Sequence, residues 1–337
     1  MNKFDYFIGI DVSKETLDFN IVHEGSTING KRIENKSKSI NILLNEWISL
    51  YKLNWDTIVF CMEHTGIYNN HLLDVLFKNN ANIYLENPIH IKRSLGLVRG
   101  KNDKIDALRI ATFAYKNVDN IKLWIPERKV VKTLRGLLST RERLVQAIEN
   151  LTIPIGESKE FDKEICKSIK QACKASVTAL KKDLQKINKS IIDVINSDER
   201  ISELYKIITS VDNVGTIVAT SIIIYTNEFK KIKNPKKFAC YSGVAPFEHS
   251  SGKSIRGKTR VSNMANKYMK KLLHLSALSS VSRKGEMRDY FDRKIKEGKN
   301  KMLILNAIRN KIILRIFACV NQNKIFEKNV KNNLVVA

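Results

Sequence analysis

The first 115 residues of the chain alternate strand-like and helix-like patterns in a defined order. Short apolar runs bounded by polar residues predict strands, and apolar residues spaced three and four apart predict helices. Strands are expected at residues 5–11, 16–23, 31–36, 57–63 and 81–86, and helices at 38–52, 68–79 and 88–117. Three early strands, then helix, strand, helix, strand and helix, is the order of an α/β domain built on one mixed sheet.

Four carboxylates fall where that fold would bring them together. Asp11 and Glu63 each end an apolar run that predicts a buried strand. Asp103 and Asp106 are three residues apart at the start of a predicted amphipathic helix, so they share one helical face. The order of predicted strands and helices resembles the RNase H-like fold. In that architecture, the metal-binding acids occupy the first strand, the fourth strand and the last helix, and the four acids of this sequence fall at those positions.

Carboxylates held close together repel one another unless a cation lies between them, and Mg²⁺ prefers oxygen ligands with positions left for water and phosphate. Two such ions about 3.5–4 Å apart would stabilise the attacking and leaving oxygens of a phosphodiester. The four acids therefore predict phosphoryl transfer with Mg²⁺ as cofactor. Taken singly, each acid is an ordinary surface group or, for Asp103, a helix cap, so the prediction depends on the set.

The charge of the chain favours a polyanionic partner. There are 59 Lys and Arg residues against 34 Asp and Glu residues, a formal net charge of +25. Between Ser250 and Arg315 there are 18 basic and 4 acidic residues. A lysine-rich composition explains part of this excess but not its concentration in one segment, so a nucleic acid is the expected partner.

Length and composition indicate a multidomain globular protein. A chain of 337 residues with 43% hydrophobic content is expected to hold two domains and an intervening helical piece. No apolar run approaches a membrane span and no signal-peptide pattern is present, so a cytoplasmic location is expected, with nucleoid association during activity. The five cysteines are scattered without CxxC spacing, which indicates neither a disulfide framework nor a zinc site.

Specific motifs give the chain a family resemblance. The segments Ile8–Lys14, Glu63–Tyr68 and Lys101–Ala107 resemble the DEDD, RuvC-like domain of bacterial insertion-sequence transposases related to the Piv invertases, a family with bridge-RNA-guided recombinases among its members. Residues Tyr241–Lys253 resemble the second half of that family, and the match spans nearly the whole chain. The resemblance implies that the chain acts on donor and target DNA, with a structured guide RNA, as a dimer or tetramer.

The resemblance also implies a serine nucleophile. Family members carry this serine immediately before the glycine of the second segment, which corresponds to Ser251, with the adjacent Ser250 as the alternative register. Attack by the hydroxyl would give a covalent phosphoserine link and free a 3′-OH, which conserves bond energy for rejoining. Because the acids lie more than 140 residues earlier, the active site would be assembled from both halves, within one chain or between protomers.

The middle of the chain predicts long amphipathic helices. Apolar residues recur at helical spacing from about Glu127 to Ile208, and Thr152–Gly156 is expected to break them into two helices. An internally packed hairpin and an intermolecular coiled coil are both compatible with this pattern. The expected domains are a RuvC-like metal-binding domain at 1–125, a helical coiled-coil linker at 126–207 and a mainly α transposase domain at 208–330.

Residues Ser210–Ile222 resemble a helix-hairpin-helix element, whose turn and helix N-terminus bind phosphate. The usual glycine is replaced by Asn213, a residue that tolerates the left-handed conformation. A plain turn between two helices is the equally compatible alternative.

One further motif is a chance match. Gly252–Thr259 fits the ATP-binding pattern GxxxxGK[ST], but the motif needs a buried strand directly before it, and the preceding residues include Pro246 and several polar side chains. We interpret the segment as a basic loop along a nucleic-acid backbone. The residues expected to contact nucleic acid in this half are Lys253, Arg256, Lys258, Arg260, Lys267, Lys270 and Lys271.

These observations together predict an RNA-guided DNA transposase or recombinase with Asp11, Glu63, Asp103, Asp106 and Ser251 as its catalytic residues. The main alternative is a RuvC-like structure-specific endonuclease, which hydrolyses DNA with metal-activated water and needs no serine. Two further alternatives are an actin-like or sugar-kinase-type ATPase and a non-catalytic nucleic-acid-binding protein. A covalent protein–DNA adduct would distinguish the first from the other three.

Overall fold

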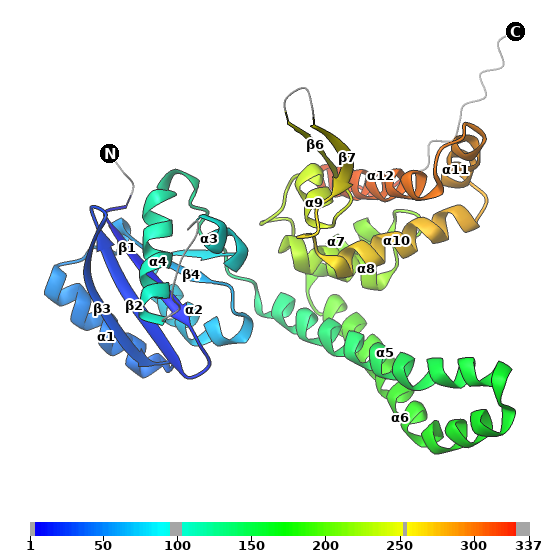
Figure 1. Cartoon of the computed structure of the whole chain (residues 1–337), viewed down its shortest axis with the longest axis horizontal. Coiled ribbons are helices and arrows are strands. Elements are labelled where there is room, and N and C mark those ends of the chain that lie inside the picture. The colour runs from blue at the N-terminus through cyan, green and yellow to red at the C-terminus, as the bar shows by residue number, and fades with distance from the viewer. Residues whose placement is uncertain (1–3, 95–102, 252–254, 328–337) are drawn as a thin grey trace, which may run out of the picture. The chain divides into compact units, whose positions relative to one another are not determined.

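The chain divides into two units, Met1–Pro126 and Glu127–Ala337, which are described separately. The structure is a computed structural model, shown in Figure 1, and it describes residues 4–94, 103–251 and 255–327. No helix within those ranges is both long enough and apolar enough to cross a membrane.

The first unit is an α/β domain built on one sheet. Its strands are β1 (Tyr6–Val12), β2 (Thr16–His23), β3 (Ser26–Glu34), β4 (Ile58–Glu63) and β5 (Asn82–Glu86). Its helices are α1 (Ser37–Tyr51), α2 (Asn70–Lys78), α3 (Pro88–Ser94) and α4 (Asp103–Lys116), with short 3₁₀ turns at Trp55–Thr57, Gly66–Asn69 and Val118–Asn120.

The sheet has the strand order β3-β2-β1-β4-β5, with β2 antiparallel to both β1 and β3 and with β4 and β5 parallel to β1. This is the order of the predicted RNase H-like fold. The predicted third strand begins five residues too late, because Ser26–Gly30 is polar and exposed along the sheet edge and shows no apolar alternation. The turn before it contains Glu24 and Gly25, both with positive φ.

The two faces of the sheet bury different cores. One face carries Ile8 and Ile10 and packs on the apolar sides of α1 and α2, including Trp47. The other face carries Phe7 and Cys61 and packs on α4, and Figure 1 shows α4 crossing that face. Since successive side chains of a strand point to opposite faces, Asp11 shares the α4 face with Phe7.

The second unit is mainly helical. Its helices are α5 (Lys129–Phe161), α6 (Lys163–Asn196), α7 (Glu199–Thr209), α8 (Thr216–Thr226), α9 (Pro235–Tyr241), α10 (Lys267–Ser282), α11 (Glu286–Lys296) and α12 (Lys301–Gln322). Its described core joins α7–α12 to the inner ends of α5 and α6, through Val131, Leu134 and Ile195 among others. The predicted separation of 126–207 from 208–330 into two domains stays a prediction.

The helices α5 and α6 lie side by side, as both views show. The expected break at Thr152–Gly156 is wrong, because α5 continues through Pro154 to Phe161 and the chain turns at Asp162. Pro154 lies on an exposed part of the helix, where the carbonyl left without an N–H partner can bind water. Asp162 instead begins α6, since its carboxylate accepts hydrogen bonds from the amides of Glu164 and Ile165.

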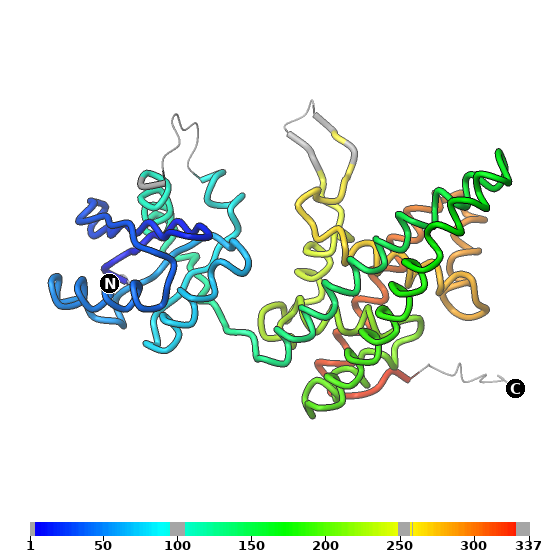
Figure 2. Tube along the Cα trace, turned by 90° about the horizontal axis from the view of Figure 1, so that it is seen from below, coloured from blue at the N-terminus to red at the C-terminus, as the bar shows by residue number. Residues whose placement is uncertain are grey.

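A two-stranded hairpin, β6 (Pro246–Ser251) and β7 (Ile255–Val261), projects from the helices of the second unit (Figures 1 and 2). The expected basic loop is therefore a pair of antiparallel strands. Its sequence contains few apolar residues and no apolar run that would predict buried strands, and Phe247 keeps 49% of its surface exposed. The rejection of the ATP-binding motif stands, because Arg256–Thr259 lie in a strand where that motif requires a helix to begin.

Candidate active site

One end of the sheet gathers acidic residues from several strands. Asp11 on β1 is directly opposite Asp18 on β2, and Ile10 pairs with Met62, so the next residues along, Asp11 and Glu63, are neighbours across β1 and β4. Side chains at paired positions point to the same face of a sheet. Asp11 and Glu63, predicted from the ends of two apolar runs, therefore emerge side by side on the face that α4 covers.

Gly9 allows α4 to approach that face closely. A methyl group added at Gly9 would lie 2.2 Å from both the carbonyl oxygen of Ala107 and the amide nitrogen of Ala111. Any side chain at this position would therefore push α4 away from β1. Because Gly9 is two residues before Asp11 on the same face, this contact positions Asp106 on α4 near the strand acids.

The electrostatics of Glu63 reflect this convergence. Burial raises the pKa of its carboxyl group above the usual value, and the negative charges of Asp11 and Asp106 raise it further. Three of the four predicted acids thus share one electrostatic environment. Within the described part of the chain, no three His, Cys, Asp or Glu side chains are arranged closely enough to hold a metal ion.

The fourth acid, Asp103, is the first residue of α4, and its side chain lies outside the described part of the structure. Asp106 accepts a hydrogen bond from Nη1 of Arg109 at 2.6 Å. This guanidinium offsets charge at the acidic end of the sheet. The chemistry of the donor set, carboxylate oxygens from two strands and one helix, fits a hard divalent cation that would complete its shell with water and phosphate.

The sequence patterns missed two further acids, which lie on strands paired with the strands of Asp11 and Glu63. Glu86 on β5 pairs with Glu63, and it accepts hydrogen bonds from Tyr84 and from the amide of Asn87, with Nδ1 of His90 3.0 Å away. Glu86 ends a predicted strand just as Glu63 does, so the same rule could have found it.

The second missed acid, Asp18, lies within β2 and does not end an apolar run. Only its pairing with Asp11 in the sheet shows that it belongs to this group of acids. It is buried beside Asp11 and is held by Nε of Arg32, 2.9 Å from both of its oxygens. Since Arg32 compensates the charge of Asp18, we regard this acid as a structural neighbour of the site.

The predicted nucleophile lies on the hairpin of the second unit. Ser251 is the last residue of β6 and pairs with Ile255, and Ser250 pairs with Arg256. Lys253 lies outside the described residues, as do the side chains of Ser250, Ser251, Arg256 and Lys258.

The remaining predicted nucleic-acid contacts lie on two elements. Arg260 is exposed near the end of β7, and Lys267 is exposed in the first turn of α10. Lys270 is half-buried, and the ammonium group of Lys271 lies 3.6 Å from Glu142 on α5. Within the second unit, these residues supply positive charge near the base of the hairpin and on one helix.

The predicted helix-hairpin-helix element forms a helix, a turn and a second helix, α7 and α8. Asn213 has the left-handed conformation, φ 62°, at the position where the usual pattern has glycine. Its side-chain oxygen accepts a hydrogen bond from Ser279 at 3.1 Å. The asparagine therefore fulfils the backbone role of glycine, while the choice between a phosphate-binding turn and a plain turn stays open.

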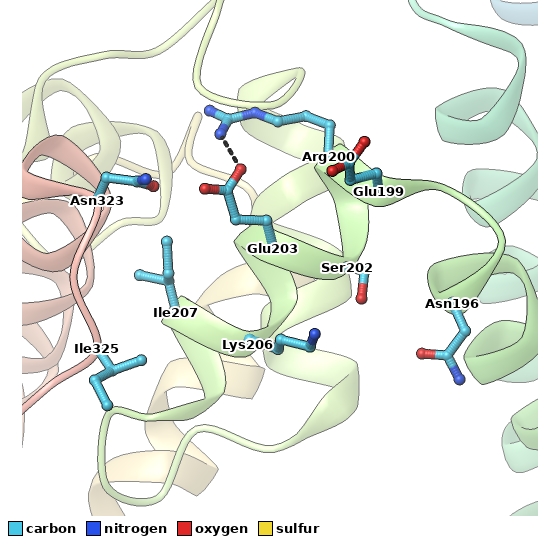
Figure 3. A pocket seen from close by; sticks show the side chains of 9 residues that line it. All are labelled: Asn196, Glu199, Arg200, Ser202, Glu203, Lys206, Ile207, Asn323 and Ile325. Carbon is cyan, nitrogen blue, oxygen red and sulfur yellow. Dashed lines mark hydrogen bonds and ion pairs between the residues drawn. The ribbon is translucent and has the colours of Figure 1, made fainter.

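A cavity of about 740 Å³ lies between α7 and the segment after α12 (Figure 3). Two of its charged side chains form an ion pair, in which Arg200 donates to Glu203 at 2.8 Å. Hydrogen bonds from Asn323 and Arg200 lower the pKa of Glu203. None of the predicted site residues lines this cavity, so we assign it no role.

Comparison with known proteins identifies two matching family models. A model of IS110 DEDD type, described as a transposase, matches residues 8–156. A second model, described as a transposase of the IS116/IS110/IS902 family, matches residues 205–292. Together they cover the acidic residues, most of the α5 helix and the hairpin with Ser251.

Several curated proteins are similar over long stretches. The pilin gene-inverting proteins of Moraxella lacunata and Moraxella bovis are each 24% identical over 330 residues, covering 96% of this chain and 98% of theirs. The 43.6 kDa protein of insertion element IS110 from Streptomyces coelicolor is 25% identical over 143 residues, covering 42% of this chain and 35% of that protein. Among solved structures, Thermus thermophilus RuvC is 15% identical with a TM-score of 0.29, covering 35% of this chain and 99% of that one.

Proposed function

Since the chain belongs to the IS110 family of transposases and recombinases, we propose that it cleaves and rejoins DNA strands with a metal-dependent acidic site and a serine nucleophile. Its similarity to two pilin gene-inverting proteins over nearly its whole length supports a recombination that rejoins strands as well as cutting them. The observation that carries the proposal is the convergence of Asp11, Glu63 and Asp106 at one end of the sheet.

Asp11, Glu63, Asp103 and Asp106 would hold the divalent cation, which we propose is Mg²⁺. The cation would supply charge stabilisation to the phosphodiester and the leaving oxygen. Two residues of the chain favour binding of a cation at this position. Gly9 keeps α4 close to β1, and burial keeps the Glu63 carboxyl in an environment where an added positive charge is strongly favoured.

The proposed strand transfer uses Ser251. Its Oγ forms a bond to the phosphorus while the bond from phosphorus to the 3′ oxygen breaks. The serine proton passes to a base, and the departing 3′ oxygen takes up a proton to become a 3′-OH. The phosphoserine link keeps the bond energy, so a 3′-OH from another strand can reverse the step and join to the phosphate. This scheme requires the hairpin of one unit to reach the acids of the other, in the same protomer or in a second one.

The proposed partners are donor DNA, target DNA and a structured guide RNA. The net charge of +25 supports sequence-independent binding to polyanions through counterion release. Target choice would then come from base pairing with the guide, while basic side chains such as Arg260 and Lys267 contact backbones. A dimer or tetramer would supply the several active sites that strand exchange needs.

Neutralising the acids tests this proposal. We expect Asp11→Asn, Glu63→Gln, Asp103→Asn and Asp106→Asn each to lower strand exchange by at least about 100-fold, because a shared metal site loses charge and geometry with any one ligand. Recombination of a reporter plasmid is measured against Mg²⁺ concentration, with thermal melting to confirm folding. Asp183→Asn on the exposed surface of α6 is the control. Near-normal exchange in two of the four variants would refute the assignment.

A further inference from the structure

A cavity at the inner end of α5 has the size and the chemistry of a nucleotide site. It has a volume of about 530 Å³ and lies between one face of α5, the end of α8 and the start of α10. Its floor is apolar, since Leu138 and Ile224 are buried. Tyr225 and Tyr268 add aromatic surface, and polar side chains of α5 surround the opening. Sites that bind small planar groups commonly combine an apolar floor with a few polar groups in this way.

One wall of the cavity is a rigid planar platform. The Arg135 guanidinium lies over the Tyr225 ring, 5.8 Å from its centre. Glu127 and the carbonyl oxygen of Ile224 accept hydrogen bonds from Arg135, so the guanidinium is held in place. Because 43% of the Arg135 side chain remains exposed, a flat ring can stack on its open side.

Tyr268 and Glu142 form a second polar pair in the lining of the cavity. The Tyr268 hydroxyl is buried and interacts with the Glu142 carboxylate. Burial, the negative charge of Glu142 and a hydrogen bond to that carboxylate raise the pKa of Tyr268 to about 12, so the hydroxyl keeps its proton and helps to position Glu142. The Glu142 carboxylate, held beside Tyr268, favours a ligand with hydrogen-bond donors.

We propose that this cavity binds one unpaired guanine of a nucleic-acid strand. Guanine carries two neighbouring donors, N1–H and the N2 amino group, which match the two oxygens of a carboxylate, and it carries the O6 acceptor beside them. The base stacks on Arg135, and its edge donates to Glu142, which Tyr268 helps to position. Two exposed basic residues, Arg143 and Lys271, supply positive charge for the adjoining phosphates. The ammonium group of Lys271 lies 3.6 Å from the Glu142 carboxylate. This inference rests on the proposed role in handling nucleic-acid strands.

The test measures the affinity of the full-length protein for short labelled single strands. Two hexanucleotides are compared, which differ only in a central guanine or an abasic residue, and GMP and AMP serve as competitors. We expect the guanine strand to bind about tenfold more tightly than the abasic strand, and GMP to compete better than AMP. Glu142→Gln and Tyr268→Phe should each reduce the preference for guanine to less than about threefold.

Matched controls separate this effect from general damage. Glu157→Gln changes an exposed acid further along α5, and Tyr290→Phe removes a hydroxyl elsewhere in the unit, and both should keep the tenfold preference. Equal binding of the guanine and abasic strands by the unmodified protein would overturn the proposal, as would a preference that survives both cavity variants. If GMP competes but the guanine and abasic strands bind equally, the cavity binds a free nucleotide, which would contradict the proposal of a base within a strand.

The outcome is independent of catalysis. Ser251→Ala should keep the preference for guanine while losing strand exchange, since the serine is not among the residues that line the cavity and contributes no charge. A preference for guanine without recombination by the unmodified protein would leave the cavity assignment intact and refute the proposed function instead.

Discussion

At the scale of single residues, the candidate site depends on a residue with no side chain. Gly9 makes room for the backbone of α4 at Ala107 and Ala111, and this contact brings the helical acids to the strand acids. The acids themselves could be predicted from the sequence, because Asp11 and Glu63 end apolar runs. Gly9 could not, since its role comes from a helix about 100 residues later in the chain.

Gly9→Ala is predicted to impair catalysis more than folding. The added methyl group must displace α4, which costs about 1–3 kcal/mol of stability and moves Asp106 away from Asp11. A displacement near 1 Å is enough to lower strand exchange about 100-fold. Strand exchange, thermal melting and DNA affinity are measured together. Gly136→Ala, where an added methyl group meets no atom within 4 Å, is the control and should retain full activity. Full activity in Gly9→Ala as well would show that the close approach is dispensable.

At the scale of elements, the helical unit shows where predictions from local sequence differ from the structure because of packing between elements. Pro154 indicated a helix end, yet α5 passes through it because the residues around it are exposed and the helix pairs with α6. The hairpin of β6 and β7 was missed because its two strands contain few apolar residues and no apolar run. The central strands were predicted well, since their burial leaves an apolar run in the sequence.

The start of α5 is fixed to this unit by an ion-pair network. Arg128 donates to Asp198 at 2.8 and 2.9 Å and to the buried Glu228 at 2.7 Å. Asp198 also caps α7 by accepting from the amide of Ile201. Hydrogen bonds from Arg128 are the main cause of the lowered pKa of Asp198.

Asp198→Asn is predicted to lower stability in a pH-dependent way. Because the pKa of Asp198 is lower in the folded state, its stabilisation is present above the unfolded-state value, near about 3.9, and is lost as pH falls through the folded value. Asparagine can still cap the helix, so the variant isolates the charge. We expect a loss of about 1–2 kcal/mol at pH 7 and a smaller loss at pH 3, measured by urea denaturation. Asp183→Asn, which removes an exposed ion pair, should change stability by less than about 0.5 kcal/mol. Equal losses at both pH values would contradict the role of the charge.

At the scale of the whole molecule, charge and motif order carry most of the argument for the proposed function. The basic excess predicted a nucleic-acid partner, and the two sets of motifs predicted the family. The fold of the first unit followed from its pattern of strands and helices. The pairing of Asp18 with Asp11 and of Glu86 with Glu63 could not be predicted, because it depends on the register between strands. No local pattern in a single sequence contains that register.

Lys258→Ala is predicted to weaken DNA binding without affecting any nucleotide site. If Lys258 contacts a phosphate, its loss lowers affinity modestly and reduces the slope of log affinity against log salt by about one. Affinity is measured over a range of salt concentrations, with Lys36→Ala in the first unit as the control. Micromolar ATP binding that disappears in Lys258→Ala would instead support an ATPase.

The central claim is that Ser251 becomes covalently joined to DNA. The protein is incubated with guide RNA, labelled donor and target DNA and Mg²⁺, the reaction is stopped with SDS, and the modified peptide of any adduct is sequenced by mass spectrometry. The account predicts a phosphodiester on Ser251, an adduct that is absent in Ser251→Ala, and unchanged DNA affinity in that variant. Phosphate on Ser250 would move the nucleophile by one residue. Cleavage that proceeds normally in the Ser250→Ala, Ser251→Ala double variant would contradict the account and identify water as the nucleophile.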